Sequence, residues 1–590
     1  MRTRTGVALA ASVALAAAAN AHAATFTVTR LDDPMPGVCD SDCSLREAVR
    51  AVDAGSGGDT IALPLGRFRL TIAGAGEDAA ATGDLDLTKS VTITGAGARQ
   101  TLIDGTGIDR VFDVASGVTA LIADVTVTGG LVNGDGGGIA SAGTLTLLRD
   151  TIANNEAIAA GNNAGGGVDS TGILAVTQST ISGNRAYNGG GINFSGTATI
   201  ADSTIAGNRA GGLGSNGDGG GISGSAGSSL ALTGSTVADN HAFNGAGSGG
   251  GIDVPAATLK SSIVANNRAH ETSGSASYVD NCSHAATSNG RNLSDGHDCG
   301  LTATGDLQDV DPRLGPLQDN GGPTDTEALL AGSPAIDAGD TCGTLDQRGT
   351  TRPRGASCDI GPYEFAPPIV TTTLALGIGL TSASLRGTVT PSSQATGYSF
   401  EYGTTTAYGA QTQALFLPPP SNSQVAVSFL VAGLKQGTSY HFRLVASNAD
   451  GISRGTDQSF TTNDRTKPVL TLLKVAPGIF RAAKGTTISF SLSEAATVTF
   501  KVDRVLPGIR KGRRCVAKTA RRRRGRACTR YVPVKGTLTQ AGTAGANSVA
   551  FDAKLGGKLL RPAAYRLSAS PRDPGLNVGK TAITAFRVRR

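Results

Sequence analysis

The chain has no tryptophan and only two methionines, and aromatic residues make up 4% of its 590 residues. A binding surface built of aromatic rings that stack on sugars is therefore not expected. Beyond the N-terminal segment no run approaches eighteen consecutive apolar residues, so no membrane-spanning helix is expected in the mature chain. The cysteines include no CxxC spacing, and nothing in the sequence therefore indicates a zinc site.

The N-terminus has the pattern of a secretory signal peptide. Arg2 and Arg4 precede an apolar run of Ala, Val and Leu, which ends at Ala21-His22-Ala23. An A-x-A text after such a run is a cleavage site, so residues 1–23 are predicted to be removed after Ala23. The alternative, a retained membrane anchor, is disfavoured because the run is too short to span a bilayer. The mature chain is expected to be secreted, and it could be associated with the cell surface.

A short pattern is repeated five times in the middle of the chain. Each copy begins with three glycines and a β-branched residue and closes with Asn, one further residue and Ala. The triplets begin at Gly136, Gly165, Gly189, Gly219 and Gly249, and the Asn residues are Asn155, Asn184, Asn208, Asn240 and Asn267. A nearly fixed period of this length indicates a solenoid, in which each unit buries its apolar face against its neighbour.

The segments between the glycine triplets alternate with period two. Thr144–Leu147 and Thr197–Ile200 are examples, and no helical period is sustained there. This pattern predicts a coil of parallel strands with roughly seven turns between Val91 and Ala269. The recurrent Asn suits a left-handed turn position and, in stacked coils, a ladder of side-chain hydrogen bonds.

Eight cysteines fall in four local pairs. In an exported chain, an even number of closely paired cysteines favours disulfide bonds. Bonds are predicted for Cys282–Cys299, Cys342–Cys358 and Cys515–Cys528, while Cys39 and Cys43 are left open because their loop is so short.

Charge and composition divide the rest of the chain. Ala366–Pro368 reads as a linker, and residues 369–463 carry short alternating strands with Leu434, Tyr440 and Phe442 placed as in the tyrosine corner of a sandwich. Residues 465–590 hold 28 Lys and Arg against four Asp and Glu, a net charge of +24, whereas the remainder carries −18. They are predicted to form a second, basic sandwich with a loop at 510–530 that includes Arg521–Arg524. Such asymmetry indicates an anionic partner.

Three local texts resemble one family of secreted bacterial proteins. Cys43–Ala48 reads CSLREA, and Gly321–Thr324, Leu329–Gly339, Asp346–Gly349 and Cys358–Glu364 are similar to the end of choice-of-anchor Q domains. Pro362 departs from the usual DIGAxE text. The repeats resemble those of polymorphic outer-membrane proteins, and residues 369–463 resemble bacterial fibronectin type III domains. The last 125 or so residues resemble a C-terminal module of secreted actinobacterial proteins.

The resemblance implies a fold and an extracellular location, but it does not imply a particular activity. It implies a right-handed, pectate-lyase-like parallel β-helix over residues 24–365, with an N-terminal cap and a choice-of-anchor Q-like end. The family has no established common activity. The predicted fold class is therefore all-β, a β-helix followed by two sandwiches of the fibronectin and immunoglobulin type.

The enzyme alternative was tested on the acidic residues. Parallel β-helices often degrade acidic polysaccharides with carboxylates from neighbouring coils. Asp135, Asp169, Asp218 and Asp253 lie near the glycine triplets but are not expected in one register, and the pair Asp32-Asp33 precedes the repeats. The rod contains no G-H-G or R-x-K text. These acids are interpreted as solvated turn residues, so no catalytic residue, cofactor or metal site is assigned.

One column and four histidines leave alternatives open. The residues that follow the ladder asparagines are Glu156, Arg185, Arg209, His241 and Arg268. Stacking would make them either a cationic stripe for an anionic polymer or a solvated turn column, and the second interpretation is favoured. A metal site would need three of His241, His270, His284 and His297 to converge.

Two functional hypotheses remain. The first is a non-catalytic surface protein with a structural, adhesive or glycan-binding role, whose 510–530 loop binds an anionic cell-wall polymer; no nucleic acid partner is expected. The second is an extracellular polysaccharide lyase or glycoside hydrolase that uses the β-helix cleft.

Overall fold

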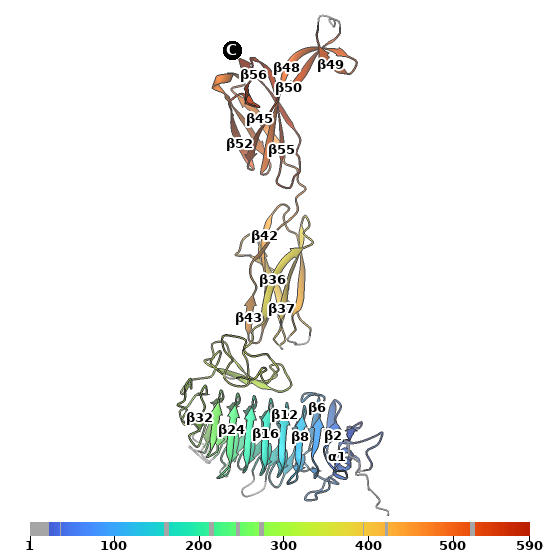
Figure 1. Cartoon of the computed structure of the whole chain (residues 1–590), viewed down its shortest axis with the longest axis vertical. Helices are drawn as coiled ribbons and strands as arrows, with labels where there is room; N and C mark the ends of the chain where they lie inside the picture. The colour runs from blue at the N-terminus through green and yellow to red at the C-terminus, as the bar shows by residue number, and fades with distance from the viewer. Residues whose placement is uncertain are drawn as a thin grey trace, which may run out of the picture.

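The computed structural model describes residues 23–35, 37–158, 164–211, 217–243, 248–270, 277–340, 342–392, 394–418, 423–519 and 525–590. A rod of parallel strands occupies the N-terminal half, and two sandwiches extend from its side (Figure 1). The only α-helix among the described residues is α1 (Leu45–Asp53). No helix in the described part is long and apolar enough to cross a membrane.

Four parallel sheets form the walls of the rod. Sheet A contains β1 (Thr25–Thr27), β2 (Asp59–Ala62), β5 (Val91–Thr94), β8 (Thr119–Ala123), β12 (Thr144–Leu148), β16 (Ile173–Thr177), β20 (Thr197–Ala201), β24 (Ser229–Thr233), β28 (Ala257–Lys260) and β32 (Thr287–Ser288). Sheet B contains β3 (Gly66–Arg69), β6 (Thr101–Asp104), β9 (Thr126–Thr128), β13 (Thr151–Ala153), β17 (Thr180–Ser182), β21 (Thr204–Ala206), β25 (Thr236–Ala238), β29 (Ile263–Ala265) and β33 (Leu293–Ser294).

The other two walls are made of shorter strands. Sheet C contains β4 (Leu85–Leu87), β7 (Phe112–Val114), β11 (Ile139–Ser141), β15 (Val168–Ser170), β19 (Ile192–Phe194), β23 (Ile222–Gly224) and β27 (Ile252–Asp253). Sheet D contains β10 (Leu131–Val132), β14 (Glu156–Ala157), β18 (Arg185–Ala186), β22 (Arg209–Ala210), β26 (His241–Ala242), β30 (Arg268–His270) and the antiparallel β31 (Ser277–Val279). Sheet A has seven strands from β5 to β28, which confirms the predicted seven coils.

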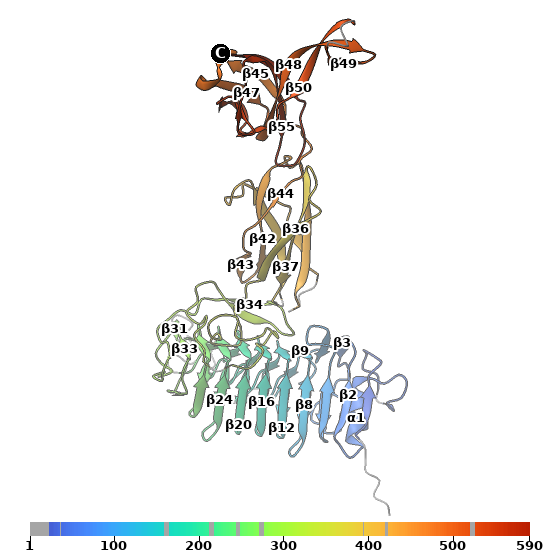
Figure 2. The same cartoon turned by 45° about the horizontal axis from the view of Figure 1, so that its top comes forward.

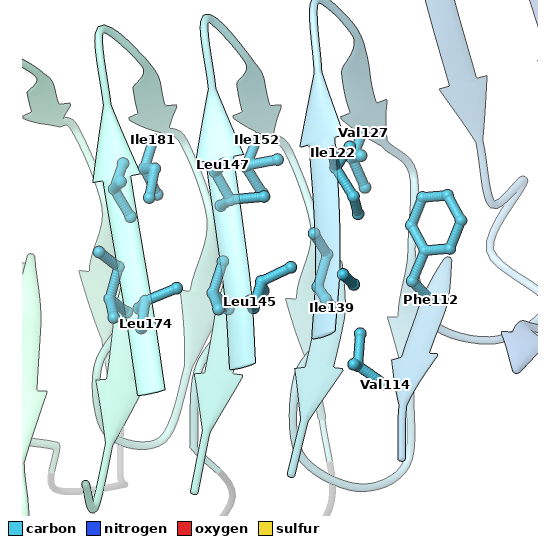
Figure 3. Close-up of a cluster of buried hydrophobic side chains, with 14 of the residues drawn as sticks. Phe112, Val114, Ile122, Val127, Ile139, Leu145, Leu147, Ile152, Leu174 and Ile181 are labelled. Carbon is cyan, nitrogen blue, oxygen red and sulfur yellow. The ribbon is translucent and has the colours of Figure 1, made fainter. Parts of the chain in front are cut away.

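The period-two pattern explains how each coil buries its apolar residues. Along β12, Leu145 and Leu147 are fully buried, while the side chains between them face outward. Figure 3 shows Leu145, Leu147 and Ile152 pointing into the rod beside their counterparts from neighbouring coils. Each such side chain contributes roughly 1.5–3 kcal/mol. Since a coil has no apolar face left over, the core is one continuous column of stacked layers.

The ladder asparagines form the predicted stack. From Asn155 to Asn267, each side-chain amide donates to the Oδ1 of the next ladder residue at 3.0 Å, and Asn281 extends the series. The left-handed conformation, however, is adopted one residue earlier, at Asn154, Gly183, Gly207, Asp239 and Asn266. The prediction of a left-handed ladder Asn was therefore wrong. The preceding residue makes the turn, which leaves the Asn side chain free to point inward.

A second polar ladder runs beside the first. The backbone N–H of Asp150 donates to Ser179 Oγ at 3.0 Å, and the same bond is repeated from Ser179 to Ser203, from Ser203 to Ser235 and from Ser235 to Ser262. These serines are buried. Ser179, Ser203 and Ser235 open the repeated Ser-Thr-Ile/Val text of the coils, and Ser262 stands at the same place in its coil. The ladder explains why a small hydroxyl residue is found there.

The CSLREA text forms the cap of the rod. Ser44 is the N-cap of α1, and its hydroxyl and the Glu47 carboxylate make a reciprocal capping box. Arg46 is fully buried and forms a two-pronged ion pair with Asp33, at 2.8 and 3.0 Å. Arg46 also donates to the carbonyls of Gly83 and Asp84. Asp33, from the Asp32-Asp33 pair, therefore holds the cap onto the first coils.

The parallel coil ends earlier than the sequence predicts. Instead of continuing to Phe365, parallel pairing between strands stops at β32 and β33. We call residues 310–365 the strap; the strands in its described part are the antiparallel pair β34 (Leu314–Gln318) and β35 (Thr326–Leu329). The strap lacks the glycine triplets and ladder Asn, and its prolines cannot donate to a sheet. It turns back and covers sheet B.

Polar contacts fasten the strap to the rod. The Gln347 amide donates to Thr180 Oγ1 at 2.9 Å and accepts from Thr204 Oγ1 at 2.8 Å. Arg99, from an early coil, pairs with Asp325 at 2.7 Å and with Asp319 at 3.0 Å. Apolar contacts of Ile263 and Leu293 with strap residues complete the seam.

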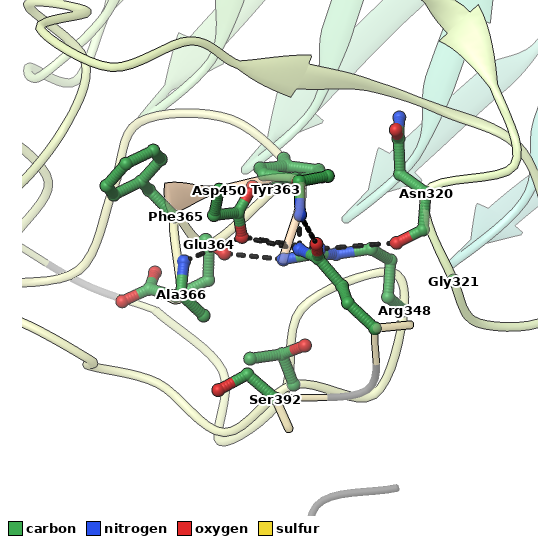
Figure 4. A network of polar contacts seen from close by, with 12 residues as sticks. Asn320, Gly321, Arg348, Tyr363, Glu364, Phe365, Ala366, Ser392 and Asp450 are labelled. Carbon is green, nitrogen blue, oxygen red and sulfur yellow. Dashed lines mark hydrogen bonds and ion pairs between the residues drawn. The ribbon is translucent and has the colours of Figure 1, made fainter. Parts of the chain in front are cut away.

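A buried network joins the strap to the next domain. Tyr363 Oη donates to Asp450 Oδ1 at 2.5 Å, and the Arg348 guanidinium lies 3.5 Å from the centre of the Tyr363 ring (Figure 4). Arg348 also pairs with Asp346 at 2.9 Å, and Gln394 donates to Asp450. Asp346, Arg348 and Tyr363, which belong to the texts that resemble the choice-of-anchor Q end, are thus buried structural groups. They make a socket for a loop of the following sandwich.

The first sandwich packs a three-stranded sheet against a larger one. The smaller sheet consists of β36 (Ile369–Leu376), β37 (Ser382–Thr390) and β41 (Val425–Ala432). The larger consists of β38 (Gly397–Gly403), β39 (Ala410–Gln411), β40 (Leu415–Phe416), β42 (Ser439–Asn448), β43 (Gly451–Arg454) and β44 (Gln458–Thr461). Tyr440 Oη accepts from the Lys435 N–H at 3.0 Å, which is the predicted tyrosine corner. The domain is fibronectin type III-like.

The last domain is a second sandwich. One sheet is β45 (Leu470–Ala476), β47 (Thr486–Leu492) and β52 (Gly545–Phe551). The other contains β46 (Ile479–Arg481), β48 (Ala496–Lys511), β49 (Arg514–Ala517), β50 (Ala527–Pro533), β51 (Leu538–Gly542), β55 (Ala563–Arg572) and β56 (Ala582–Arg589). A short 3-10 turn, η1 (Ala482–Lys484), and the pair β53 (Lys554–Leu555) and β54 (Lys558–Leu559) complete it.

Candidate functional site

The basic segment 510–530 is a three-stranded projection rather than a loop. Strand β48 continues beyond the sandwich and pairs with β49 on one edge and β50 on the other. These strands project away from the domain, and we call residues 505–519 and 525–533 the finger (Figure 2). The expectation of a loop was wrong because the segment alternates and pairs along most of its length. Arg521–Arg524 lie outside the described residues.

The Cys515–Cys528 bond staples the finger across its middle strand. Cys515 is on β49 and Cys528 is on β50, so the bond passes over β48 at Gly508. A Cβ atom at Gly508 would lie 2.6 Å from Cys515 Sγ, so only glycine fits beneath the bond. The other predicted disulfides, and Cys39–Cys43, are also present.

The finger presents positive charge that is not neutralised locally. Its exposed cations among the described residues are Arg510, Lys511, Arg513, Arg514, Lys518 and Arg526. None of the ion pairs formed within the described part involves these six; the nearest pair, Arg566 with Asp503 at 2.6 Å, lies at the base. The arrangement is suited to binding an anionic surface through exposed, salt-sensitive charges.

The column that follows the ladder asparagines is stacked as predicted. Strand pairing places Glu156 beside Arg185, Arg185 beside Arg209, Arg209 beside His241, and His241 beside Arg268. Arg185 forms an ion pair with Glu156 at 2.9 Å. The Arg209 guanidinium lies 4.2 Å from the centre of the Phe243 ring. One end of the column is therefore neutralised, while the other end remains cationic.

The four acids named from the sequence fall into two pairs. Asp169 and Asp253 share one column of sheet C, three coils apart, and Asp135 and Asp218 share the neighbouring column with the same separation. The four acids therefore do not lie in one register, as expected, but each of the two columns holds a pair, which was not foreseen from the sequence. At about 4.8 Å per coil, the two acids of each pair lie about 14 Å apart. This exceeds the roughly 6.5–9.5 Å between the carboxylates of an inverting glycosidase.

Sequence reasoning missed a group of acids on sheet C, near the N-terminal end of the rod. Asp86 and Asp113 stand in the same column as Asp169, and Asp84 and Asp109 lie close by. The signal was the recurrent apolar-Asp text in Leu85–Leu87, Phe112–Val114, Val168–Ser170 and Ile252–Val254. Together with Asp135, these residues form what we call the acidic patch: Asp84, Asp86, Asp109, Asp113, Asp135 and Asp169.

Burial raises the pKa values of several carboxyl groups of the acidic patch toward neutral pH. Burial, with the carboxylates of Asp86 and Asp109, raises the pKa of Asp84 to about 7. Burial likewise raises the pKa values of Asp86 and Asp169 to about 6. Arg110 lies among them, paired with Asp113 and 3.6 Å from Asp84. A neutral carboxylic acid near an ionised one is what general acid catalysis of glycoside cleavage requires.

A Ser, a His and an Asp meet at the far end of the same face without forming a catalytic triad. Ser283 Oγ donates to Asp253 Oδ1 at 2.5 Å and contacts His284 Nδ1 at 2.7 Å. In a triad the carboxylate orients the imidazole nitrogen opposite the serine. Here the same Nδ1 lies 3.6 Å from Asp253, so the serine interacts with both partners on one side.

The four histidines named from the sequence do not converge on one point. His241 and His270 contact each other at 2.8 Å, and His297 contacts Asp309 at 3.0 Å. Among the described residues, one group of three acids could hold a metal ion, with its ligand atoms within 4.8 Å of one another. It lies between the two sandwiches and consists of Asp464, Glu494 and Asp573. Burial, together with Asp464 and Asp573, raises the pKa of Glu494. Three carboxylates are suitable ligands for a calcium ion.

Comparisons with known proteins add little to this geometry. No protein-family model and no curated protein matches the chain. Among solved structures, the chain is similar to FN1–FN3 of chicken CNTN1 (13% identity, 39% of this chain, 69% of that one, TM-score 0.18). It is also similar to a two-domain fibronectin type III segment of chicken tenascin (14%, 38% and 99%, TM-score 0.15). A third is the sensor domain of the anti-sigma factor RsgI4 of Pseudobacteroides cellulosolvens (17%, 17% and 96%, TM-score 0.14). At these scores the likeness carries no argument about function.

Proposed function

We propose that the chain is a secreted or cell-surface modular protein with a structural or adhesive role, which uses its basic end to hold an anionic cell-wall polymer. The observation that carries the proposal is the finger: six exposed cations without an ion pair in the described part, on strands that project at the end of the molecule distant from the rod (Figure 1). Charge of one sign at this density favours an oppositely charged partner.

The finer identity of the rod belongs to the same proposal. We infer that the coil is right-handed, since crossovers between parallel strands are right-handed in about 98% of cases. Membership of the CSLREA and choice-of-anchor Q family is proposed on the motif residues, which serve as cap, strap and socket. Removal of residues 1–23 during export is supported by the four disulfides, which are typical of an oxidising compartment.

The test measures co-sedimentation of the mature chain with cell-wall particles that carry or lack their anionic polymer. The finger variant replaces Arg510, Arg513 and Arg514 by Gln. The matched control replaces Lys558, Lys580 and Arg587, exposed cations of the same sandwich. Binding should fall at least tenfold in the finger variant and less than threefold in the control, and it should weaken with salt because exposed charges are screened within about 10 Å at 0.1 M. Equal loss in both variants would contradict a role for the finger.

A second candidate function is cleavage of an extracellular polysaccharide. The specific observation that favours it is the acidic patch, where Asp84 has a pKa of about 7 beside the Arg110-paired Asp113. As a general acid Asp84 would protonate the leaving oxygen. Release of reducing ends from acidic glycans by the intact chain, abolished in Asp84→Asn, would support it. No release from any glycan tested at pH 5–8 would eliminate it.

A further inference from the structure

The cationic end of the sheet D column is a preorganised group of four side chains. Arg209 and Arg268 stand two coils apart with His241 between them, and His241 Nδ1 contacts His270 Nε2 at 2.8 Å. Phe243 is buried beneath them, stacked on the His270 ring with a centroid distance of 4.9 Å. We call Arg209, His241, Arg268 and His270 the cationic patch. The aromatic contacts fix Arg209, His241 and His270 and reduce the entropy that a ligand must remove from these side chains.

Within the described part of the chain, the positive charge of this patch is not balanced by an ion pair. Neither Arg209 nor Arg268 forms an ion pair with a described residue; Asp239 interacts with Arg268 only beyond ion-pair distance. Burial and the neighbouring Arg185 lower the pKa of Arg209. Burial, His270, Arg209 and Arg268 lower the pKa of His241, and burial, Arg209 and Arg268 lower that of His270. A bound anion would relieve this mutual repulsion.

The spacing of the two arginines restricts the ligand. Two coil steps at about 4.8 Å separate their backbones by about 10 Å, and the Arg209 guanidinium is held 4.2 Å from the centre of the Phe243 ring. A ligand with two anionic groups along the direction in which the coils stack meets both arginines without drawing their side chains together, as a single small anion would have to do. Between the arginines, neutral imidazoles offer a donor and an acceptor, which suit hydroxyl groups.

We propose that the cationic patch binds a linear anionic carbohydrate polymer that runs along the rod axis, with successive acidic groups at Arg209 and Arg268 and its hydroxyls at the two histidines. Planar guanidinium groups accept carboxylate or sulfate oxygens in two-pronged fashion. The cationic patch is separate from the finger, and one protein molecule can bind polymer at both.

Histidine signals give a readout that the finger does not affect. Of the six histidines of the chain, His22 lies in the predicted signal peptide, and ¹³C-histidine labelling of the mature protein resolves the other five by NMR. Two probes distinguish the acidic group: a hexameric oligogalacturonate and a heparin-derived hexasaccharide. Saturation with a bound probe should shift the His241 and His270 signals and raise their pKa values, while His297 and His441, already paired with Asp309 and Asp457, stay unchanged. Affinity should rise as the pH falls from 7.5 to 5.5.

Three variants test the assignment. Arg268→Gln removes one exposed cation, and affinity measured by the histidine shifts should fall at least fivefold. The double variant Arg209→Gln with Arg268→Gln removes both cations, and affinity should fall at least twentyfold. Arg185→Gln, from the same column but neutralised by Glu156, is the matched control and should change affinity less than twofold. The proposal is overturned if no probe moves the two histidine signals, if Arg185→Gln weakens binding as much as Arg268→Gln, or if a single-stranded DNA of equal charge binds equally well.

Discussion

At the scale of the residue, the rod depends on side chains that satisfy the backbone of neighbouring coils. Asn208 is fully buried; it accepts from the N–H and the amide of Asn184, and it donates to Ile181 O and Asn240 Oδ1. The recurrence of Asn in the sequence predicts such a ladder. It does not tell which neighbour takes the left-handed turn, since Asn, Asp and Gly all tolerate that conformation.

Asn208→Ala should destabilise the rod by about 3 kcal/mol, because the substitution leaves several buried donors and acceptors without partners. The free energy of unfolding is measured with denaturant by circular dichroism. Thr199→Ala, an exposed position on β20 of the same coil, is the control and should change it by less than about 0.5 kcal/mol. A similar small change for Asn208→Ala would show that the ladder does not support the fold.

Glu327 makes the seam under the strap sensitive to pH. The residue is 2% exposed, both carboxyl oxygens lack a hydrogen-bond partner among the described residues, and burial with the nearby Asp239 raises its pKa to about 8. An unfolded Glu titrates near 4.3. The folded state therefore holds an extra proton between these values, and stability must fall as the pH rises from about 4 to 8.

Glu327→Gln should remove this dependence. Between pH 5 and 8 the wild-type chain should lose a few kcal/mol more than the variant, since each pKa unit corresponds to about 1.4 kcal/mol. Unfolding midpoints at a series of pH values measure the difference. Asp319→Asn, a change of an exposed carboxyl in the same strap, should keep the wild-type slope. Identical slopes for Glu327→Gln and wild type would mean that Glu327 ionises freely.

At the scale of the element, the strap is the part that sequence reasoning placed least well. Strand alternation, tyrosine corner and disulfide pairs depend on local patterns, and these predictions were confirmed. The resemblance to a family of β-helix proteins extended the predicted coil through the strap, although the strap sequence carries none of the repeats of the coil. Its position depends on contacts across long sequence separations, such as Gln347 with Thr180, which no local pattern encodes. The acidic patch was missed for a related reason: register aligns acids that are far apart along the chain.

Arg348→Met should weaken both the strap and its junction with the first sandwich. The guanidinium is fully buried between Asp346, Asp450 and the Tyr363 ring, and its loss leaves buried carboxylates uncompensated, at a cost of about 3–5 kcal/mol. Limited proteolysis should then cut near residues 366–368 at protease concentrations that spare the wild type. Tyr363→Phe, which removes the two hydrogen bonds of the hydroxyl with Asp450 and Gln394 but keeps the ring beside Arg348, should have a smaller effect. An Arg348→Met chain as resistant as wild type would refute the socket.

At the scale of the whole molecule, the two ends differ in charge and in shape. An acidic rod with one cationic patch is joined through a buried socket to a fibronectin-like domain, and a strongly basic sandwich follows with its finger exposed. The sequence alone was enough to predict the rod followed by two sandwiches, the sign of the net charge on the last sandwich and on the remainder, and three of the four disulfides; the Cys39–Cys43 bond had been left open. The direction of the finger was not predictable, because it depends on β48 continuing past the sandwich to pair on both edges.

Hydrogen exchange of the intact mature chain, with and without anionic wall polymer, tests the central claim most directly because it locates the contact. The account predicts slower exchange in β49, β50 and the outer part of β48, with this protection lost at high salt. Protection confined to β4, β7 and β15 along the acidic patch, with the finger unchanged, would contradict it and favour the polysaccharide-cleaving alternative.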